Sequence, residues 1–192
     1  VTGSLGMIPR LCEDAGIDCY PGVWISGDKK ENEKGVLELI QVANQEFSCI
    51  KGLIVGNEVL LREDLSEGEL IDYIERVRRS TNLPVGTADV WQVWEEHPEL
   101  AAAVDFVLVH IHPYWDGIAV EKAADYVFEK WQELEQSYPE KRVMIGETGW
   151  PTRGHKNGKA VAGEENQRIF LSRFLVLNRD HDAGYFLFEV FD

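Results

Sequence analysis

The sequence predicts an incomplete TIM-type (β/α) barrel with about six βα units. Short apolar runs rich in β-branched residues alternate with longer amphipathic segments along the chain, a pattern typical of parallel strands joined by helices. No glycine-rich dinucleotide turn follows the first run, which favours a barrel over a doubly wound sheet. A complete barrel takes about 250 residues. The chain has 192 residues, so we expect two strands of a full barrel to be missing from it.

Six runs have the length and composition of buried strands. They are Ile17–Ile25, Ile50–Glu58, Pro84–Asp89, Asp105–Trp115, Arg142–Trp150 and Tyr185–Phe191. The helical segments are Ser4–Ala15, Glu31–Gln45, Ser66–Arg79, Trp91–Ala103, Val120–Ser137 and Glu164–Asn178. Ser66, followed three residues later by Glu69, has the spacing of a capping box and predicts a helix start there.

Length and composition favour one partial barrel domain over residues 1–192. Hydrophobic residues make up 44% and charged residues 28% of the chain, as in globular proteins. The formal net charge of −15 disfavours nucleic acid and anionic lipid as partners. The apolar stretch Val104–Ile111 is too short to cross a bilayer, so we expect no membrane insertion. Cys12, Cys19 and Cys49 match neither a metal-ligand spacing nor a paired disulfide framework, which predicts three buried or half-buried thiols.

Two glutamates terminate otherwise apolar strands. Glu58 ends the second predicted strand after Gly56-Asn57, and Glu147 lies at the end of the fifth after Gly146. In a βα barrel the carboxyl ends of the strands form the open mouth that holds the reacting groups. A carboxylate loses water there, so two of them at equivalent strand ends favour a functional role over rim capping. Two carboxyl groups facing each other suit glycoside hydrolysis.

Four motifs make the resemblance to a known family specific. They are Val55-Gly56-Asn57-Glu58-Val59, His110-Ile111-His112-Pro113-Tyr114-Trp115, Gly146-Glu147-Thr148-Gly149-Trp150-Pro151 and Phe188-Glu189-Val190-Phe191-Asp192. In order and spacing they resemble glycoside hydrolase family 17, especially its bacterial members, from Val1 to Asp192. The resemblance implies a retaining endoglucanase, glucosidase or glucanosyltransferase that acts on β-1,3-glucan. It further implies that Glu58 is the general acid/base and Glu147 the nucleophile.

Several polar and aromatic residues near the strand ends are candidates for substrate binding. Asn57 could bind a sugar hydroxyl beside the reacting centre. His110, His112 and Tyr114 alternate, so we expect them on one face of one strand. Flat aromatic faces stack on sugar rings, which makes Trp115 and above all Trp150 candidates, each against a core-packing alternative. Glu189 ends the last strand and could either line the mouth or form a rim ion pair.

The predicted function is therefore a retaining glycoside hydrolase or transglycosylase on β-1,3-glucan, without a metal or other cofactor. One alternative is a non-catalytic glucan-binding or assembly fragment. Another is a metal-dependent hydrolase on the same fold that uses His110 and His112. The substrate class favours a periplasmic or extracellular location. Open barrel edges rich in apolar side chains predict a homodimer that covers them.

Overall fold

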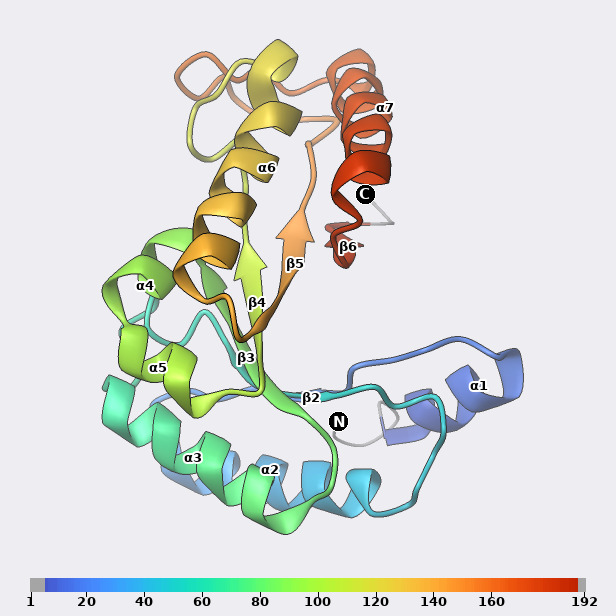
Figure 1. Cartoon of the computed structure of the whole chain (residues 1–192), viewed down its shortest axis with the longest axis vertical. Helices are drawn as coiled ribbons and strands as arrows, with labels where there is room; N and C mark the ends of the chain where they lie inside the picture. The colour runs from blue at the N-terminus through green and yellow to red at the C-terminus, as the bar shows by residue number, and fades with distance from the viewer. Residues whose placement is uncertain (1–5, 190–192) are drawn as a thin grey trace. The chain divides into compact units, whose positions relative to one another are not determined.

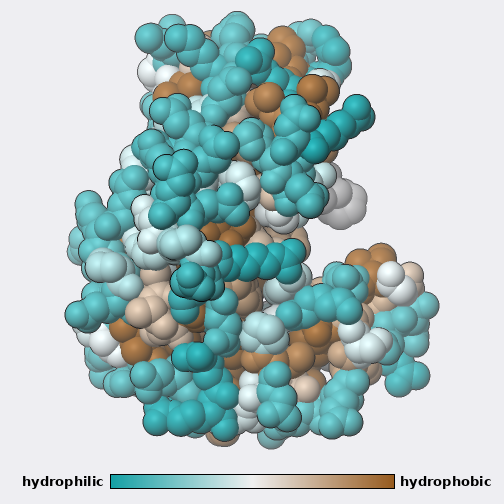
Figure 2. Space-filling model, in the orientation of Figure 1, coloured by the Kyte–Doolittle hydropathy of each residue, from teal (hydrophilic) through white to brown (hydrophobic). Residues whose placement is uncertain are grey.

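The computed structural model describes residues 6–189 of the chain and divides into two compact units. The first unit is Val1–Val107 and the second is Leu108–Asp192. The boundary falls inside strand β4 (Phe106–His110), so this strand contributes its first residues to one unit and its last to the other. Figure 2 shows that polar side chains cover most of the visible face of each unit.

The first unit is a parallel sheet packed against helices (Figure 1). Its strands follow one another in the order β1 (Gly22–Val23), β2 (Leu53–Asn57) and β3 (Val85–Val90), and the start of β4 comes next. Its helices are α1 (Ile8–Ala15), α2 (Lys29–Ala43), α3 (Glu67–Ser80), α4 (Trp91–Glu96) and α5 (Pro98–Ala103). Leu39, Leu53 and Ile74 are fully buried between these layers, which makes apolar burial the main stabilising term.

The second unit contains the end of β4, strands β5 (Arg142–Thr148) and β6 (Tyr185–Leu187), and two long helices. Helices α6 (Val120–Ser137) and α7 (Glu164–His181) lie side by side (Figure 1). The rings of Phe128 on α6 and Phe174 on α7 stack with centroids 5.1 Å apart. Trp131 packs beside them and donates its indole N–H to the carbonyl of Val143 in β5, which ties α6 to the strand beneath it.

The predicted alternation of strands and helices is confirmed, and several predicted elements are shorter than expected or interrupted. The first strand shrinks to β1, with Cys19 forming only an isolated bridge to Ile50. The helix predicted over Trp91–Ala103 breaks into α4 and α5 because Pro98 disfavours helical backbone at the preceding residue. The fourth strand ends at His110, ahead of Pro113, which has no amide hydrogen to donate.

The end of the chain differs in the same way. The sixth strand, predicted as Tyr185–Phe191, ends at Leu187, and residues 190–191 of that prediction lie outside the described residues. Among residues 6–189 no helix combines the length and the apolar character that a membrane crossing needs. The three cysteines are free thiols, as predicted: Cys49 is buried, and Cys12 and Cys19 are half-buried.

Candidate active site

In the first unit, Glu58 follows the last residue of β2 at a point where the strand is irregular. Ile54 pairs with Gly86 and Asn57 with Ala88, so β2 holds one extra residue between these pairs. Such a bulge bends a strand and re-aims its last side chains. Glu58 has a φ of 52°, a left-handed conformation that a side chain disfavours by about 1 kcal/mol. Strained backbone of this kind clusters at functional sites.

Gly56 makes this strand end possible. Its φ is 86°, and a Cβ there would lie 2.6 Å from Cγ2 of Val59, which is fully buried beneath the turn. The Glu58 amide donates to the carbonyl of Ala88 at 2.7 Å, so β3 still holds the displaced residue. Both Asn57 and Glu58 are half-buried. The local sequence therefore delivers a partly exposed glutamate on a fixed backbone.

In the second unit, Glu147 lies in an equivalent irregular strand end. Ile145 pairs with Tyr185 and Thr148 with Leu187, so β5 also carries one extra residue, across the segment that contains Glu147. The Glu147 carbonyl accepts a hydrogen bond from the Ile111 amide at 2.9 Å. The Glu147 side chain is 24% exposed. The main chain of the candidate nucleophile is thus held between β6 and the segment that follows β4, while its side chain remains accessible.

Two histidines contact the carboxylate of Glu147. Nε2 of His112 lies 3.3 Å from Oε2, and Nε2 of His110 lies 3.8 Å from Oε1. His110 is buried, and Gly146 leaves the space for it, because a Cβ at Gly146 would lie 2.8 Å from the imidazole Cδ2. Because β4 ends at His110, His112 lies beyond the strand that was predicted to hold it, but both imidazoles are directed at the same carboxylate. His110 at the end of β4 and His112 just after the strand therefore both contact Glu147.

These three side chains also have the chemistry of a metal-ligand set. One donor atom from each of His110, His112 and Glu147 lies within 4.8 Å of the others. Two imidazoles and a carboxylate are typical zinc ligands. The same geometry serves without a metal, since an imidazole that donates a hydrogen bond stabilises an ionised carboxylate. With a metal ion or without one, the two histidines would orient the Glu147 carboxylate.

The aromatic candidates in the second unit divide by burial. Trp115 is 72% exposed, whereas Tyr114 and Trp150 are 4% and 3% exposed. The indole of Trp150 donates to the carbonyl of Val161, and its ring meets Tyr114 edge-on at 5.5 Å. This burial is at odds with the expectation that Trp150 offers its face to a sugar. Trp150 and Tyr114 are therefore packed side chains, and Trp115 is the aromatic candidate that stays exposed.

The main chain at Trp115 is held by hydrogen bonds from Asn157. Nδ2 of Asn157 donates to the carbonyl oxygens of Tyr114 and Trp115 at 3.0 and 2.7 Å. The Tyr114 hydroxyl donates to the carbonyl of His155, and the Tyr114 ring meets Trp115 edge-on at 5.2 Å. The main chain at Trp115 is therefore fixed, and its exposed ring has the edge of Tyr114 as a neighbour.

Glu189 is exposed and lines an open cavity of about 800 Å³ in the second unit. The other lining residues come from the segment after β5 and from the start of α7: Pro151, Thr152, Arg153, Glu164 and Gln167. This lining is polar and carries both signs of charge. Such a surface suits hydrogen bonding to a hydroxyl-rich ligand more than an apolar one.

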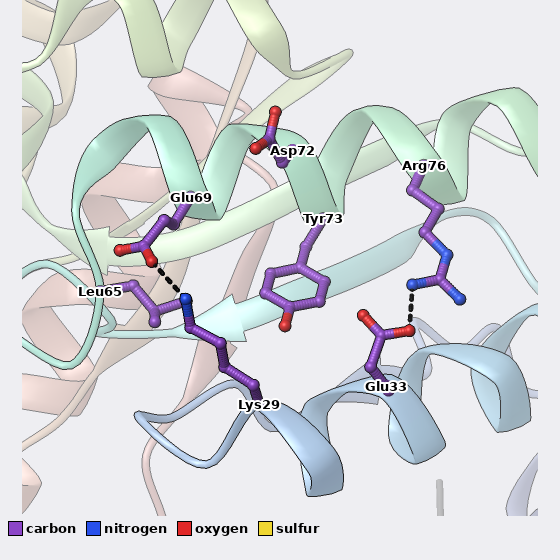
Figure 3. Close-up of a pocket in the computed structure, with 7 residues that line it drawn as sticks. All are labelled: Lys29, Glu33, Leu65, Glu69, Asp72, Tyr73 and Arg76. Atoms are coloured by element: carbon purple, nitrogen blue, oxygen red, sulfur yellow. Dashed lines mark hydrogen bonds and ion pairs between the residues drawn. The ribbon is translucent and has the colours of Figure 1, made fainter.

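A second groove lies between α2 and α3, on the helical side of the first unit (Figure 3). Its volume is about 240 Å³, and the ring of Tyr73 lies at its centre. Lys29 pairs with Glu69 at 2.8 Å, and Arg76 pairs with Glu33. Each of these cations is matched by an acid, which is typical of a helix–helix seam.

The sequence alone assigned no role to Asp89, the buried carboxylate near the end of β3. It is 1% exposed and accepts hydrogen bonds from the amides of Leu60 and Val90. Burial raises the pKa of the Asp89 carboxyl above its ordinary value, and the charge of Glu58 adds to the rise. An acidic residue near the end of the apolar run Val85–Val90 is the sequence signal that could have found it.

The chain is similar to known glycoside hydrolases along nearly its whole length. The family model of the BtgE/BtgC glycoside hydrolase domain matches residues 2–192. A btgC protein of Aspergillus niger is 34% identical over 196 residues, which are 89% of this chain and 28% of that protein. The glucan endo-1,3-beta-glucosidase btgC of Emericella nidulans is 30% identical over 213 residues, or 98% of this chain and 32% of that protein. The chain thus spans about a third or less of these relatives.

Among solved structures, a glycoside hydrolase family 17 beta-1,3-glucanosyltransferase from Rhizomucor miehei resembles the chain with a TM-score of 0.88 and 28% identity. That likeness covers 96% of this chain and 70% of the other. The predicted resemblance to family 17 and the predicted fold class, part of a (β/α) barrel with six βα units, are thereby confirmed. The chain belongs to the BtgE/BtgC glycoside hydrolase domain family.

Proposed function

We propose that this chain carries the catalytic pair of a retaining glycoside hydrolase or transglycosylase that acts on β-1,3-glucan. Glu58 is the acid/base and Glu147 is the nucleophile. One observation carries the proposal. Strand β2 holds one extra residue just before Glu58, and β5 holds one extra residue in the segment that contains Glu147. Two strands that are altered in the same way next to a glutamate are better explained by chemistry than by packing.

The substrate class is supported by what similar proteins are named for. The Emericella nidulans relative is a glucan endo-1,3-beta-glucosidase, and the Rhizomucor miehei structure is a beta-1,3-glucanosyltransferase. An active-site mutant of that transferase has been solved in complex with laminaritriose. We therefore propose that the substrate is a β-1,3-linked glucan oligosaccharide or polysaccharide. A neutral chain of this kind is compatible with the net charge of −15.

The mechanism assigns one step to each glutamate. Glu58 protonates the glycosidic oxygen while Glu147 attacks the anomeric carbon, forming a glycosyl-enzyme and releasing the leaving alcohol. Glu58 then takes a proton from the incoming acceptor, which is water in hydrolysis or a sugar hydroxyl in transfer. His110 and His112 orient Glu147 for attack, and His112, at 17% side-chain exposure, can also reach a sugar hydroxyl.

Substrate binding is assigned to residues around these two groups. Asn57 bonds a hydroxyl next to the reacting centre, and Glu189 contacts hydroxyls from the polar cavity that it lines. Trp115 stacks on a glucosyl ring, since its side chain is 72% exposed while Asn157 holds its main-chain carbonyl. Tyr114 and Trp150 maintain the wall behind it.

The test is turnover of laminarin and of laminari-oligosaccharides, followed as reducing-sugar release for hydrolysis and as changed oligosaccharide lengths for transfer. Glu147→Gln should reduce kcat at least about 10³-fold, because the nucleophile is lost. Glu140→Gln is the matched control, since this exposed acid precedes the opposite end of β5 and should leave turnover unchanged. Product stereochemistry by NMR should show the β anomer first. An α anomer as first product would contradict the retaining mechanism.

A second candidate, a metal-dependent hydrolase, is favoured by the donor set of His110, His112 and Glu147. The two candidates differ in their response to chelation. Under the proposed mechanism, dialysis against EDTA leaves laminarin turnover intact. Loss of activity that added Zn²⁺ restores would favour the metal-dependent alternative. A chain that binds laminarin but neither releases reducing sugar nor changes the lengths of laminari-oligosaccharides would be a glucan-binding fragment.

We also propose a homodimer that covers the outer strands. Exposed apolar side chains accompany both of them: Trp24 follows β1 with 61% exposure, and Phe186 and Phe188 lie in and after β6 with 39% and 51%. Apolar groups along an outer strand favour association with another chain.

A further inference from the structure

The backbone that follows Glu58 is a tight turn with its own internal hydrogen bonds. The amide of Arg62 donates to the carbonyl of Glu58 at 3.0 Å, and the amide of Asp64 donates to the carbonyl of Val59 at 3.1 Å. Because Glu58 has a φ of 52°, this backbone is held away from its preferred conformation. Contacts from outside the turn must therefore hold it in place.

One external anchor is the guanidinium of Arg62. It donates to the carbonyl oxygens of Asn57 and Ile25, and it pairs with Asp64 at 2.7 Å. The guanidinium also lies over the ring of Trp24, 4.2 Å from its centroid. Arg62 thus fixes the peptide that joins Asn57 to Glu58 to the segment after β1.

The other anchor is the carboxylate of Asp89. Its Oδ2 accepts the amide of Leu60 at 3.1 Å, and its Oδ1 accepts the amide of Val90 at 2.9 Å. One oxygen therefore holds the turn and the other holds the end of β3. The indole of Trp94 donates to the Asp89 carbonyl at 3.1 Å, so the main chain of Asp89 is itself fixed.

Burying the carboxylate of Asp89 to hold two backbone amides costs free energy. Asp89 is 1% exposed, and burial raises the pKa of its carboxyl above the ordinary value. Backbone amides, including that of Leu61, oppose the rise, and the charge of Glu58 adds to it. An asparagine would have the same shape but only one acceptor oxygen, so it could hold only one of the two amides. Two accepting oxygens are what the double contact requires.

We propose that Asp89 is a positioning residue for Glu58: it fixes the turn that follows Glu58 and thereby aims the acid/base at the leaving oxygen. Arg62 acts on the same peptide from the other side. The inference rests on the proposed role of Glu58 as the acid/base. Protonation matters most when the leaving alcohol is a poor one, so loss of aim slows natural glucan more than activated substrates.

The test compares two substrates in Asp89→Asn and in wild type. With laminari-oligosaccharides, whose leaving group is a sugar, kcat should fall about 10- to 100-fold while KM changes about twofold or less. With a 2,4-dinitrophenyl β-glucoside, whose leaving group needs little protonation, kcat/KM should fall by less than about threefold, because kcat/KM reports the first step and not the later step in which Glu58 is the base. In the same variant, hydrogen exchange at the Leu60 amide should accelerate relative to amides of β2. Arg62→Met should give the same split between substrates.

Asp105→Asn is the matched control, because Asp105 also accepts a backbone amide, that of Val85 at 2.9 Å, but precedes the opposite end of β4. It should leave the ratio of the two rates unchanged. If wild type is active and Asp89→Asn slows both substrates equally, or slows neither, the positioning role is overturned while the proposed function stands. If wild type turns over neither substrate, the proposed function fails and the inference fails with it.

Discussion

At the scale of single residues, Gly146 shows how closely the environment of Glu147 is packed. A Cβ at this position would lie 2.6 Å from Cγ of Leu108 and 2.8 Å from Cδ2 of His110. Both neighbours are buried, so they have little room to move. We expect Gly146→Ala to lower the free energy of unfolding by about 1 to 3 kcal/mol, as overpacking of a core does.

Gly68 is the control for this prediction, because a Cβ there would meet nothing within 4 Å in helix α3. Gly68→Ala should raise the free energy of unfolding by about 0.5 to 1 kcal/mol through helix propensity. Urea unfolding of both variants measures the two opposite signs. Equal effects would show that the space around Gly146 is wider than the structure indicates.

The thiols of the first unit give a second prediction at this scale. Burial raises the pKa of Cys19 to about 12, and its Sγ lies 3.7 Å from that of Cys49, whose pKa burial also raises. The thiolate is the reactive form, so at pH 8 only about one Cys19 thiol in 10⁴ would react readily. Iodoacetamide at pH 8 should modify both thiols in urea but not in the native chain, as read by mass spectrometry of peptides. Rapid native labelling of Cys19 would contradict this.

The sequence alone could locate Glu58 and Glu147, because each ends an apolar run after glycine, but it could not show what holds them. The left-handed backbone of Glu58 depends on an extra residue in β2, and pairing register is a tertiary property. His112 contacts Glu147 from beyond the end of β4, and the alternation of residues 110–114 does not show where the strand ends. The burial of Trp150 likewise depends on packing that local sequence does not specify.

At the scale of elements, the capping box of α3 is the clearest local signal that the structure confirms. The Ser66 hydroxyl accepts the amide of Glu69, and the Glu69 carboxylate accepts the amide of Ser66. Ser66→Ala should lower the free energy of unfolding by about 1 kcal/mol, since two helix-end contacts are lost. Ser137→Ala, at the exposed end of α6, should change it by less than about 0.5 kcal/mol. Urea unfolding compares them.

Glu69 also links this helix end to pH. Hydrogen bonding to Lys29 and to Ser66 lowers the pKa of Glu69 from 4.5 to about 2. A lowered pKa in the folded chain means that the stabilisation is present above pH 4.5 and is lost as the pH falls toward 2. The difference in unfolding free energy between wild type and Glu69→Gln should therefore shrink across this interval. A difference that stays constant down to pH 2 would contradict the role of the charge.

Other elements show where local reasoning succeeds and where it stops. Helix α6 has the bounds that periodicity predicts, Val120–Ser137, because one apolar stripe of Ala123, Val127 and Trp131 faces β5. The segment 91–103 has similar composition but breaks at His97, where Pro98 overrides periodicity. Strand β1 shrinks because pairing with β2 decides its length, and that pairing is not encoded in residues 17–25 alone.

At the scale of the whole molecule, fold class could be predicted because βα alternation is a local signal repeated six times. The division into two compact units could not, since the boundary falls inside β4 and neither a linker nor a shift in composition marks it. Each unit provides one of the two proposed catalytic glutamates. One catalytic domain over residues 1–192 stays a prediction.

The last prediction concerns association of whole chains. Phe186 and Phe188 expose apolar surface along β6, and burying such surface stabilises by about 25 cal/mol per Å². Light scattering at low micromolar concentration should give a species of twice the 21.8 kDa chain mass. Phe188→Glu should dissociate it, because a charge would then be buried without a partner.

Val176→Glu is the matched control, since Val176 is 59% exposed on α7 of the same unit but lies away from the outer strand. It should leave the dimer intact, because a charge at an exposed helix position stays in water. A single species of 21.8 kDa in wild type would remove the proposed dimer. Dissociation by both variants alike would extend the interface to α7, because only a charge inside the interface carries the cost of burial.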